Sequence, residues 1–436
     1  MEKLIFDLSG EGKPFKVLNA TNGGPWHKRH KKTLLRSNFE SYKAARIPFS
    51  RNHDSAVHGV YGGYHSHDMT GIFPNEDADP RNPQSYDFAN TDEAILSCLE
   101  AGTETFFRLG QSACTTFKTH WRNRPKDFHH WALVSEHIIR HYNQGWAEGH
   151  HLNIRYWEIW NEPDLHPEHP PERRFWGGTK EEFFDFYEIV AKHLKKCFPN
   201  IKLGGPSIAS SLEWAEEFLC EMQKRNVPLD FFSWHCYAKV PEKIMDKAER
   251  VRTLLCKYGY SETESILNEW NYVKGWTDQF QYSVNMIHGL KGSAFTMSCI
   301  CLAQQSAIDM LMYYDTRPSA FCGVFDFYSY QPLKGYYPLY WYGMFYDMEK
   351  EIPSENTVDN LYSLCGVYKD GKVLSLVTYY SDEDDAPSKK VSLDLGRPGR
   401  YDVYLLDSEH DGQWIKCTDQ LEFEMQLFTT ILIREK

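Results

Sequence analysis

The sequence predicts a parallel α/β barrel of the (β/α)₈ type, followed by a small antiparallel β-domain. Three observations support this prediction. Short runs rich in aromatic and β-branched residues alternate with longer amphipathic runs up to about residue 350, which is typical of repeated strand–helix units. Two of the strand-like runs, 155–162 and 265–269, end in the same pair, Asn-Glu. After Pro353 the helical pattern stops and only strand-like runs remain.

The alternation yields eight strand–helix units, the number that a closed barrel of this type requires. The expected strands are 16–19, 47–51, 105–109, 155–162, 201–205, 230–235, 265–269 and 309–314. The expected helices are 34–45, 91–101, 127–146, 180–197, 212–224, 241–258, one that starts near Asp278, and 336–348. The long polar loop that ends at Phe88 exceeds an ordinary connection and is a candidate functional loop.

The last part of the chain predicts only β-structure. Runs 361–369 and 372–380 flank Asp370-Gly371, which is typical of a hairpin turn. Runs 391–395, 401–406 and 421–433 add further strands, and the short run 4–8 completes the set. We therefore assign residues 15–350 to the (β/α)₈ barrel, and residues 351–436 together with 1–14 to a β-sandwich accessory domain.

The composition of the chain restricts the classes of partner that the protein is expected to bind. A formal net charge of −12 argues against nucleic acid, which proteins approach with a basic surface. The longest nearly apolar run, 293–303, is too short to cross a bilayer, and the first residues show no signal-peptide pattern. The 11 cysteines are scattered without paired spacing, which is typical of reduced thiols. We expect a cytoplasmic protein with no nucleic-acid or membrane partner, and a homo-oligomer remains open.

Polar side chains gather at the predicted carboxyl ends of the strands, which face a common mouth in a barrel of this type. They are Arg51, His53, Asn161, Glu162, His235, Tyr237, Glu269, Tyr314 and Asp315. Core packing does not account for such a collection of acids, histidines and an arginine at one end of the barrel. We therefore interpret them as a candidate catalytic and substrate-binding site.

The two glutamates have the residue types that break a glycosidic bond with retention of configuration. That reaction needs one protonated carboxyl group and one ionised group about 5 Å away. Glu269 suits the nucleophile, held ionised by Arg51 and hydrogen-bonded by Tyr237. Glu162 suits the acid/base, because nearby aromatics and the charge of Glu269 raise its pKa. Asn161 is placed to bind the sugar 2-hydroxyl.

The chain resembles glycoside hydrolase family 39, which contains β-xylosidases and α-L-iduronidases. The matching segments are Ser50-Arg51-Asn52-His53, Trp160-Asn161-Glu162-Pro163-Asp164-Leu165, Phe175-Trp176, Leu203-Gly204-Gly205-Pro206, Ser233-Trp234-His235-Cys236-Tyr237 and Asn268-Glu269-Trp270-Asn271. The resemblance implies a retaining (β/α)₈ enzyme with Glu162 on strand four as acid/base and Glu269 on strand seven as nucleophile. The chain departs from the family at Tyr313-Tyr314-Asp315, where the family usually places a Trp, and in the loosely matching loop 57–74.

Several residues also have simpler interpretations. Glu162 and Glu269 are alternatively buried structural acids, although their matching contexts disfavour this. His65-x-His67-Asp68, His129-His130 and His150-His151 resemble partial metal sites, but none has the spacing of a recognised zinc site. We interpret these histidines as surface or sugar-binding residues and expect neither a metal nor a cofactor. Trp157 is expected to pack the barrel, and Cys236 to face away from the site.

We therefore expect a retaining, exo-acting glycoside hydrolase that cleaves a β-xyloside or a similar neutral β-glycoside. An alternative within the class is a uronic-acid glycoside, with Lys274 or Arg317 contacting its carboxylate. Lys274 and Tyr314 accordingly complete the expected substrate-binding set. From other classes, a sugar-binding protein without turnover and a histidine-rich metalloenzyme remain competing hypotheses.

Overall fold

The barrel is closed by eight parallel strands, as predicted. The structure is a computed structural model that describes residues 1–25, 37–51, 67–110, 124–165, 175–318 and 321–436. The strands are β2 (Val17–Asn22), β3 (Phe49–Arg51), β4 (Glu104–Leu109), β5 (Tyr156–Ile159), β6 (Lys202–Ile208), β7 (Phe231–Ala238), β8 (Glu264–Tyr272) and β9 (Met310–Tyr313). They follow one another around the barrel in chain order, and β9 pairs with β2 to close it.

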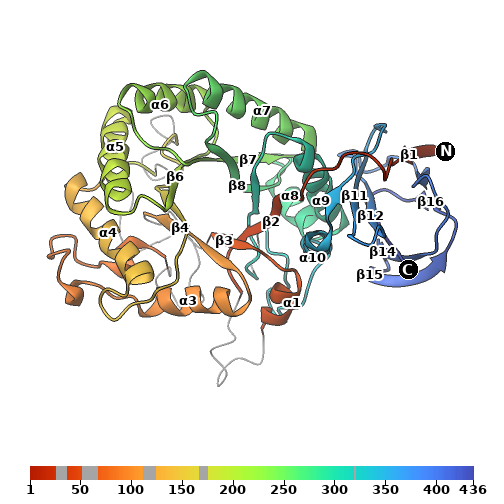
Figure 1. Cartoon of the computed structure of the whole chain (residues 1–436), viewed down its shortest axis with the longest axis horizontal. Coiled ribbons are helices and arrows are strands. Elements are labelled where there is room, and N and C mark those ends of the chain that lie inside the picture. The colour runs from red at the N-terminus through yellow and green to blue at the C-terminus, as the bar shows by residue number, and fades with distance from the viewer. Residues whose placement is uncertain (26–36, 52–66, 111–123, 166–174, 319–320) are drawn as a thin grey trace.

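Helices surround this barrel (Figure 1). They are α1 (Phe39–Ala44), α2 (Met69–Ile72), η2 (Pro83–Ser85), α3 (Ala89–Glu100), α4 (Phe128–Gln144), α5 (Lys180–Cys197), α6 (Leu212–Lys224), α7 (Pro241–Lys257), α8 (Phe280–Ile287), α9 (Leu290–Gln305), α10 (Tyr336–Met344) and η5 (Phe345–Asp347). The single helix expected after strand seven is two helices, α8 and α9, bent by 78° with respect to each other. Together α8 and α9 have the length and composition of a membrane span, whereas no single helix of the described residues has them.

The interior of the barrel has an apolar lower layer and a polar upper layer. The side chains of the lower layer form one hydrophobic cluster: Ala20, Phe49, Phe106, Tyr156, Phe231, Ile266, Met310 and Met312. Buried polar side chains follow toward the carboxyl ends: Asn22, Arg51, Glu158, Ser207, Ser233 and Asn268. Because side chains alternate along a strand, Tyr156 and Glu158 point inward while Trp157 packs against the surrounding helices. The polar layer forms the floor of the barrel mouth.

The accessory domain consists of two sheets around a separate apolar core. One sheet contains β1 (Glu2–Ile5), β13 (Lys389–Asp394) and β16 (Glu422–Met425). The other contains β10 (Lys350–Glu351), β11 (Leu361–Val367), β12 (Val373–Tyr379), β17 (Thr430–Glu435), β14 (Tyr401–Leu406) and β15 (Asp411–Thr418). β11 and β12 form the predicted antiparallel hairpin. The run 421–433 is two strands rather than one. The sequence pattern does not reveal β15, because all of its side chains are exposed or half-buried.

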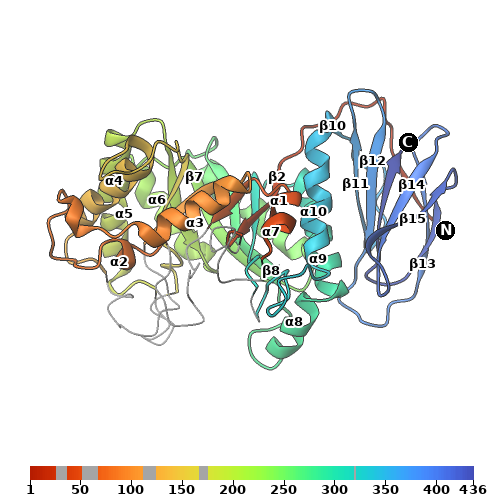
Figure 2. The same ribbon diagram turned by 90° about the horizontal axis from the view of Figure 1, so that it is seen from below.

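The accessory domain packs against α9, whose side chains are buried nearly all round. Figure 2 shows this domain beside α9 and α10, with α8 projecting from the edge of the barrel. Asp382 of the accessory domain lies 3.0 Å from Lys239, 3.5 Å from Lys274 and 3.3 Å from the buried Lys291. It also accepts a hydrogen bond from Tyr272 Oη at 2.9 Å. One carboxylate therefore joins the accessory domain to the segments that follow β7 and β8.

Candidate active site

Arg51 lies at the end of β3, completely buried at the top of the polar layer. All five of its guanidinium N–H groups donate hydrogen bonds. The acceptors are Glu158 Oε2 at 2.6 Å, Glu269 Oε1 at 2.8 Å, Asn161 Oδ1 at 2.6 Å, Ser207 Oγ at 2.9 Å and Asn22 Oδ1 at 3.2 Å. The predicted contact of Arg51 with Glu269 is present. Its assignment as a substrate-binding residue is corrected, because no N–H group remains for a ligand.

Glu158 is a site residue that the sequence analysis missed. It points into the barrel from the middle of β5 and accepts hydrogen bonds from Arg51, Ser207 Oγ and Asn268 Nδ2. Complete burial opposes its ionisation, but the charge of Arg51 and hydrogen bonding with Ser233, Arg51 and Ser207 hold the pKa of Glu158 below its ordinary value. The sequence does contain a signal for this role: Glu158 is an acid at an inward-facing position of a strand whose other side chains are mainly apolar.

A β-bulge in β8 places two consecutive side chains on the same side of the strand. Leu267 pairs with Trp234 and Glu269 pairs with His235, so Asn268 has no opposing residue on β7. Asn268 therefore reaches Glu158 while Glu269 reaches Arg51, both inside the barrel. Without the extra residue, alternation would turn one of them outward.

Glu162 follows β5 in a backbone conformation that non-glycine residues rarely adopt. Its φ is +50°, and that of Trp160 is +72°. The Glu162 N–H donates to the Ser207 carbonyl at 2.9 Å. The Asp164 carboxylate accepts from the backbone N–H groups of Ala209, Ser210 and Ser211 at 2.8, 2.8 and 2.9 Å. These bonds hold the turn that carries Glu162 against the end of β6, which offsets the strain of the left-handed conformation.

Glu162 and Glu269 face each other across His235. The Nδ1 atom of His235 lies 2.7 Å from Glu162 Oε1 and 3.6 Å from Glu269 Oε2. Tyr237 Oη donates to Glu269 Oε2 at 3.0 Å. Oxygens of the two carboxylates lie within 4.8 Å of each other. Two acids thus share one small space and differ in their hydrogen-bond donors.

The environments of these two acids separate their protonation states. Burial, together with the negative charge of Glu269, raises the pKa of Glu162 above its ordinary value, although the hydrogen bond from His235 opposes this rise. Glu269 instead contacts the guanidinium of Arg51, and an opposite charge at hydrogen-bond distance favours the ionised form of a carboxyl group. The arrangement thus supplies a proton donor and an ionised carboxylate side by side.

The other residues singled out from the sequence lie around the two acids, in the hydrophobic core or outside the described residues. Asn161 is buried with its carbonyl bound to Arg51, which leaves its amide Nδ2 for a ligand. Tyr314 is half-buried, with its ring centre 6.5 Å from that of Tyr237. His53 lies outside the described residues. Cys236 is buried against the surrounding helices, and burial raises the pKa of its thiol.

The two cations expected to contact a uronate carboxylate already have carboxylate partners. Lys274, expected to contact the substrate, instead has its ammonium 3.5 Å from Asp382 and over the ring of Tyr282. Arg317 pairs with Asp315, with Nε at 2.9 Å from Oδ2. Each cation therefore has a carboxylate of the protein beside it, although Lys274 shares Asp382 with Lys239 and Lys291.

A group of aromatic side chains beside Tyr237 was not singled out from the sequence. Trp276 is 57% exposed, and its ring centre lies 5.0 Å from that of Tyr237, nearly perpendicular to it. Phe280 stacks on Trp276 at 5.7 Å, and Phe321 lies 6.2 Å from the same ring. We call Tyr237, Trp276, Phe280 and Phe321 the aromatic wall. It leads from the hydrogen-bond partner of Glu269 outward to solvent.

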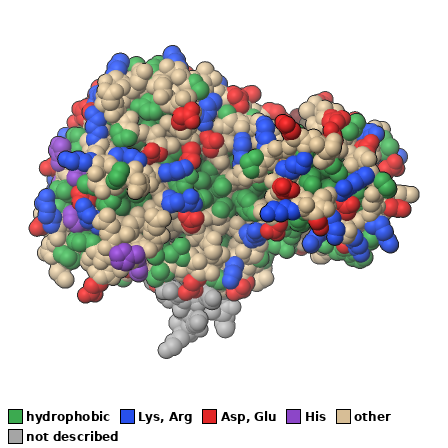
Figure 3. All heavy atoms as spheres, viewed as in Figure 1, with side chains coloured by type: hydrophobic (Ala, Val, Ile, Leu, Met, Phe, Trp, Pro, Cys, Tyr) green, Lys and Arg blue, Asp and Glu red, His purple; other side chains and the backbone are tan. Residues whose placement is uncertain are grey.

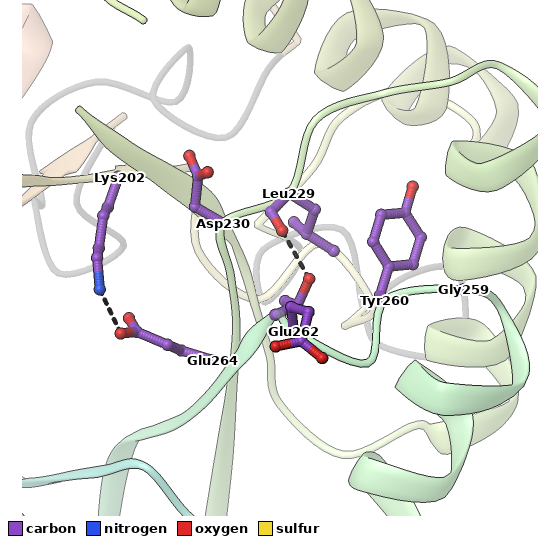
Figure 4. Close-up of a pocket in the computed structure, with 8 residues that line it drawn as sticks. Lys202, Leu229, Asp230, Gly259, Tyr260, Glu262 and Glu264 are labelled. Atoms are coloured by element: carbon purple, nitrogen blue, oxygen red, sulfur yellow. Dashed lines mark hydrogen bonds and ion pairs between the residues drawn. The ribbon is translucent and has the colours of Figure 1, made fainter. Parts of the chain in front are cut away.

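A separate depression of about 340 Å³ lies at the opposite end of the barrel (Figure 4). Its lining includes Lys202, Asp230 and Glu264, at the amino-terminal ends of β6, β7 and β8. Lys202 and Glu264 form an ion pair there. Because the catalytic end of such barrels is the carboxyl end of the strands, we interpret this depression as part of the stabilising face.

Three groups of side chains in the described residues have the donor atoms and spacing to hold a metal ion. They are Glu162, His235 and Glu269 at the mouth, Glu136, His193 and Cys197 between α4 and α5, and Asp92, His141 and His150 near α3 and α4. Of the histidine pairs noted in the sequence, only His150-His151 contributes a member. His65 lies outside the described residues.

Comparison with known proteins identifies relatives of one class, the glycoside hydrolases. The family model of glycosyl hydrolases family 39 matches residues 43–278, more than half of the chain. A β-xylosidase of Caldicellulosiruptor saccharolyticus is 31% identical over 187 residues, which cover 41% of this chain and 36% of that protein. One of Geobacillus stearothermophilus is 30% identical over 189 residues, covering 40% and 36%. The chain therefore matches only about a third of the length of these relatives.

Solved structures share the fold over the whole chain. A glucosidase from Croceicoccus marinus superposes with a TM-score of 0.81 at 21% identity, covering 100% of this chain and 99% of that one. A monomeric β-xylosidase from Caulobacter crescentus superposes with a TM-score of 0.71 at 15% identity, covering 100% and 99%. At these identities the likeness shows the fold alone.

The Arg51 network predicts a large stability loss on Arg51→Lys. Lysine keeps the charge but has three donors in place of five, so buried carboxylate and amide oxygens lose partners. We expect a decrease in the free energy of unfolding of about 3 kcal/mol, measured by urea denaturation. Arg155→Lys is the matched control, because Arg155 makes a two-bond pair with Glu104 at the surface and should lose less than about 1 kcal/mol. Equal losses in the two variants would contradict the importance of the buried network.

Proposed function

Because this chain belongs to glycosyl hydrolases family 39, as the match over residues 43–278 shows, we propose that it hydrolyses a β-glycoside with retention of configuration at Glu162 and Glu269. The spacing of the two acids supports this mechanism. Their oxygens lie within 4.8 Å of each other, which suits direct attack by one carboxylate. Inverting enzymes separate the two groups by about 6.5–9.5 Å to leave room for a water molecule.

The reaction proceeds in two displacements. In the first, the Glu269 carboxylate attacks the anomeric carbon while Glu162 gives its proton to the departing oxygen, so a glycosyl ester forms and the glycosidic bond breaks. In the second, the Glu162 carboxylate takes a proton from water, the water oxygen attacks the anomeric carbon, and Glu269 is released. The second acid has no purpose in a protein that only binds sugar, so two acids at this spacing favour turnover over binding alone.

The surrounding side chains have positioning roles in this proposal. Arg51 and Tyr237 donate to both oxygens of Glu269, which fixes the orientation of the nucleophile. His235 holds the acid/base at 2.7 Å. Because Arg51 binds the carbonyl of Asn161, the amide Nδ2 is the atom that contacts the sugar 2-hydroxyl. Hydrogen bonds to that hydroxyl strengthen in the transition state.

A neutral glycone of the β-xyloside type is the proposed substrate, cleaved from the chain end. The two matched relatives are β-xylosidases. Lys274 and Arg317, the cations that a uronate would need, are paired with Asp382 and Asp315. The aromatic wall offers apolar ring faces near the nucleophile, which suit the C–H faces of a sugar. We place the enzyme in a reducing compartment such as the cytoplasm, because all ten cysteines in the described ranges are free thiols.

Separate alanine variants test the division of roles. Glu269→Ala should abolish turnover of every substrate, because no glycosyl-enzyme forms. Glu162→Ala should still be glycosylated by a substrate with a good leaving group, since that step needs little protonation, but should release the sugar slowly. We expect a burst of leaving group in stopped-flow assays and a sugar-sized mass increase on Glu269 in peptide mass spectrometry.

Added azide completes this test, because it attacks the glycosyl-enzyme without needing a base. It should restore turnover of Glu162→Ala and give a glycosyl azide with the anomeric configuration of the substrate. An azide product of inverted configuration, or an adduct on another residue, would show that the roles are assigned wrongly.

The raised pKa of Glu162 predicts the basic limb of the pH–rate profile. The first step needs protonated Glu162, so kcat/KM should fall as the pH rises through this pKa. His235 lowers that pKa through its hydrogen bond. His235→Phe should therefore move the basic limb to higher pH while lowering the maximum rate. Tyr237→Phe is the control, since its hydroxyl bonds Glu269; a basic limb that moves equally in both variants would contradict the assignment.

The neutral-substrate proposal predicts that an aryl β-xyloside has a higher kcat/KM than the aryl uronides. Cations already paired with carboxylates of the protein gain little from a uronate, whose own desolvation then remains uncompensated. A panel of chromogenic aryl glycosides measures the order. Faster hydrolysis of a uronide, lost in Lys274→Ala or Arg317→Ala, would establish the uronic-acid alternative instead.

A further inference from the structure

Three side chains converge on the outer surface of the barrel, away from the mouth. Asp92 belongs to the first turn of α3, His141 to the last turn of α4, and His150 to the segment before β5. His141 Nε2 lies 3.1 Å from Asp92 Oδ1, and His150 Nε2 lies 3.5 Å from Asp92 Oδ2. Figure 3 shows histidine side chains at the edge of the molecule where Figure 1 places α4.

The hydrogen bond on the far side of His141 determines which of its nitrogens has the lone pair. Nδ1 lies 2.9 Å from the backbone carbonyl of Trp146, an acceptor only, so Nδ1 carries a proton. In the neutral ring Nε2 is then unprotonated, and its lone pair faces a carboxylate oxygen. A second proton on Nε2, which makes an imidazolium–carboxylate pair with Asp92, or a metal ion in its place removes the repulsion between the two. A metal-binding histidine typically has its other N–H bound in this way by a backbone carbonyl.

The spacing of the donor atoms matches a coordination shell. Imidazole nitrogens and carboxylate oxygens bind zinc at about 2.0–2.2 Å, so neighbouring ligand atoms lie about 3.0–3.5 Å apart. The distance from His141 Nε2 to Asp92 Oδ1, 3.1 Å, and that from His150 Nε2 to Asp92 Oδ2, 3.5 Å, fall in this interval, so each histidine faces a different oxygen of the carboxylate. One donor atom from each of the three residues lies within 4.8 Å of the others.

The surroundings hold the ligands in place, and the Asp92 carboxylate pairs with histidines rather than with a permanently charged residue. The ring of His141 stacks on Phe88 at 3.6 Å, and Tyr142 Oη donates to Asp92 Oδ1 at 2.9 Å. Within the described part of the chain, Asp92 pairs with these two histidines and with no lysine or arginine. The side chains of Asp92 and His150 are about a quarter exposed, which gives water access to the open coordination positions.

The second surface group provides a contrast. Glu136, His193 and Cys197 also converge, but the Arg140 guanidinium lies 2.7 Å from Glu136 Oε1. A fixed positive charge at that distance repels a metal ion and already neutralises the carboxylate. The Asp92 group has two imidazoles and one carboxylate without such a competitor. This donor set suits zinc and neighbouring divalent transition metals.

We propose that Asp92, His141 and His150 form a metal site for a divalent transition-metal ion of the zinc type, separate from the two catalytic carboxylates. The site joins α3, α4 and the segment that enters β5, so the bound ion stabilises this side of the barrel. It plays no part in the proposed glycoside hydrolysis. Removal of the metal therefore lowers thermal stability and leaves the catalytic rate at moderate temperature unchanged.

Isothermal titration of chelator-treated, dialysed enzyme with zinc sulfate tests the proposal. We expect the wild type to bind one equivalent more than His150→Ala and Asp92→Asn. His151→Ala is the matched control, because His151 is the exposed neighbour of His150 and should keep the full stoichiometry. Zinc binding elsewhere, at the catalytic acids or at Glu136, is common to all four proteins and cancels in this comparison.

Thermal unfolding with and without zinc provides the second readout. Zinc in excess of its dissociation constant should raise the Tm of the wild type and of His151→Ala by several degrees, and should not raise it in His150→Ala or Asp92→Asn. Asp92→Asn preserves the volume of the side chain, so a folded variant is available even if His150→Ala fails to fold. Equal zinc stoichiometry and equal Tm shifts in wild type and both ligand variants would overturn the proposal.

Discussion

The charge of Arg51, buried at the centre of the barrel mouth, is the constraint on which the site depends. A guanidinium completely removed from water costs several kcal/mol unless its charge and its donors are matched. Glu158 and Glu269 supply the opposite charge, and Asn161, Ser207 and Asn22 supply the remaining acceptors. These acceptors belong to β2, β5, the turn after β5, β6 and β8. The need to match one buried cation therefore fixes the ends of several strands relative to one another.

The same network accounts for the different states of the two catalytic acids. Arg51 has one positive charge, and Glu158 and Glu269 together have two negative charges when ionised. A third buried carboxylate would raise the negative charge further in a space of low polarity. Burial and the Glu269 charge accordingly raise the pKa of Glu162, and the proton that it retains is the one needed by the leaving group. Asp164, which holds the turn after β5, adds a further negative charge that favours the protonated state of Glu162.

The sequence predicts this site only as far as strand ends and residue types allow. The rule that carboxyl ends of barrel strands share a mouth brought Glu162, Glu269, His235 and Tyr237 together correctly. The bulge at Asn268 has no compositional signal, because a strand with one extra residue reads like a strand without it. Glu158 looked like part of the strand leading to Glu162. The roles proposed for Asn161 and Tyr314 stay predictions, since their contacts with a sugar depend on a ligand.

Lys274 shows that the accessory domain, as well as the barrel, determines which side chains are available to a substrate at the mouth. It follows Glu269 by five residues, so the strand-end rule assigned it to the substrate. Its partner Asp382 comes from the accessory domain, and that pairing has no local signal in the sequence. Asp382 also binds Lys239, two residues after Tyr237, and the nearly inaccessible ammonium of Lys291.

Since the Lys291 ammonium is almost fully buried, its charge needs carboxylate partners, and both Asp384 at 2.8 Å and Asp382 at 3.3 Å come from the accessory domain. Asp382 is thereby tied to both segments that carry the nucleophile and its hydrogen-bond partner beyond their strands. The accessory domain is thus bound to the catalytic end of β7 and β8 by electrostatic necessity as well as by the apolar face of α9.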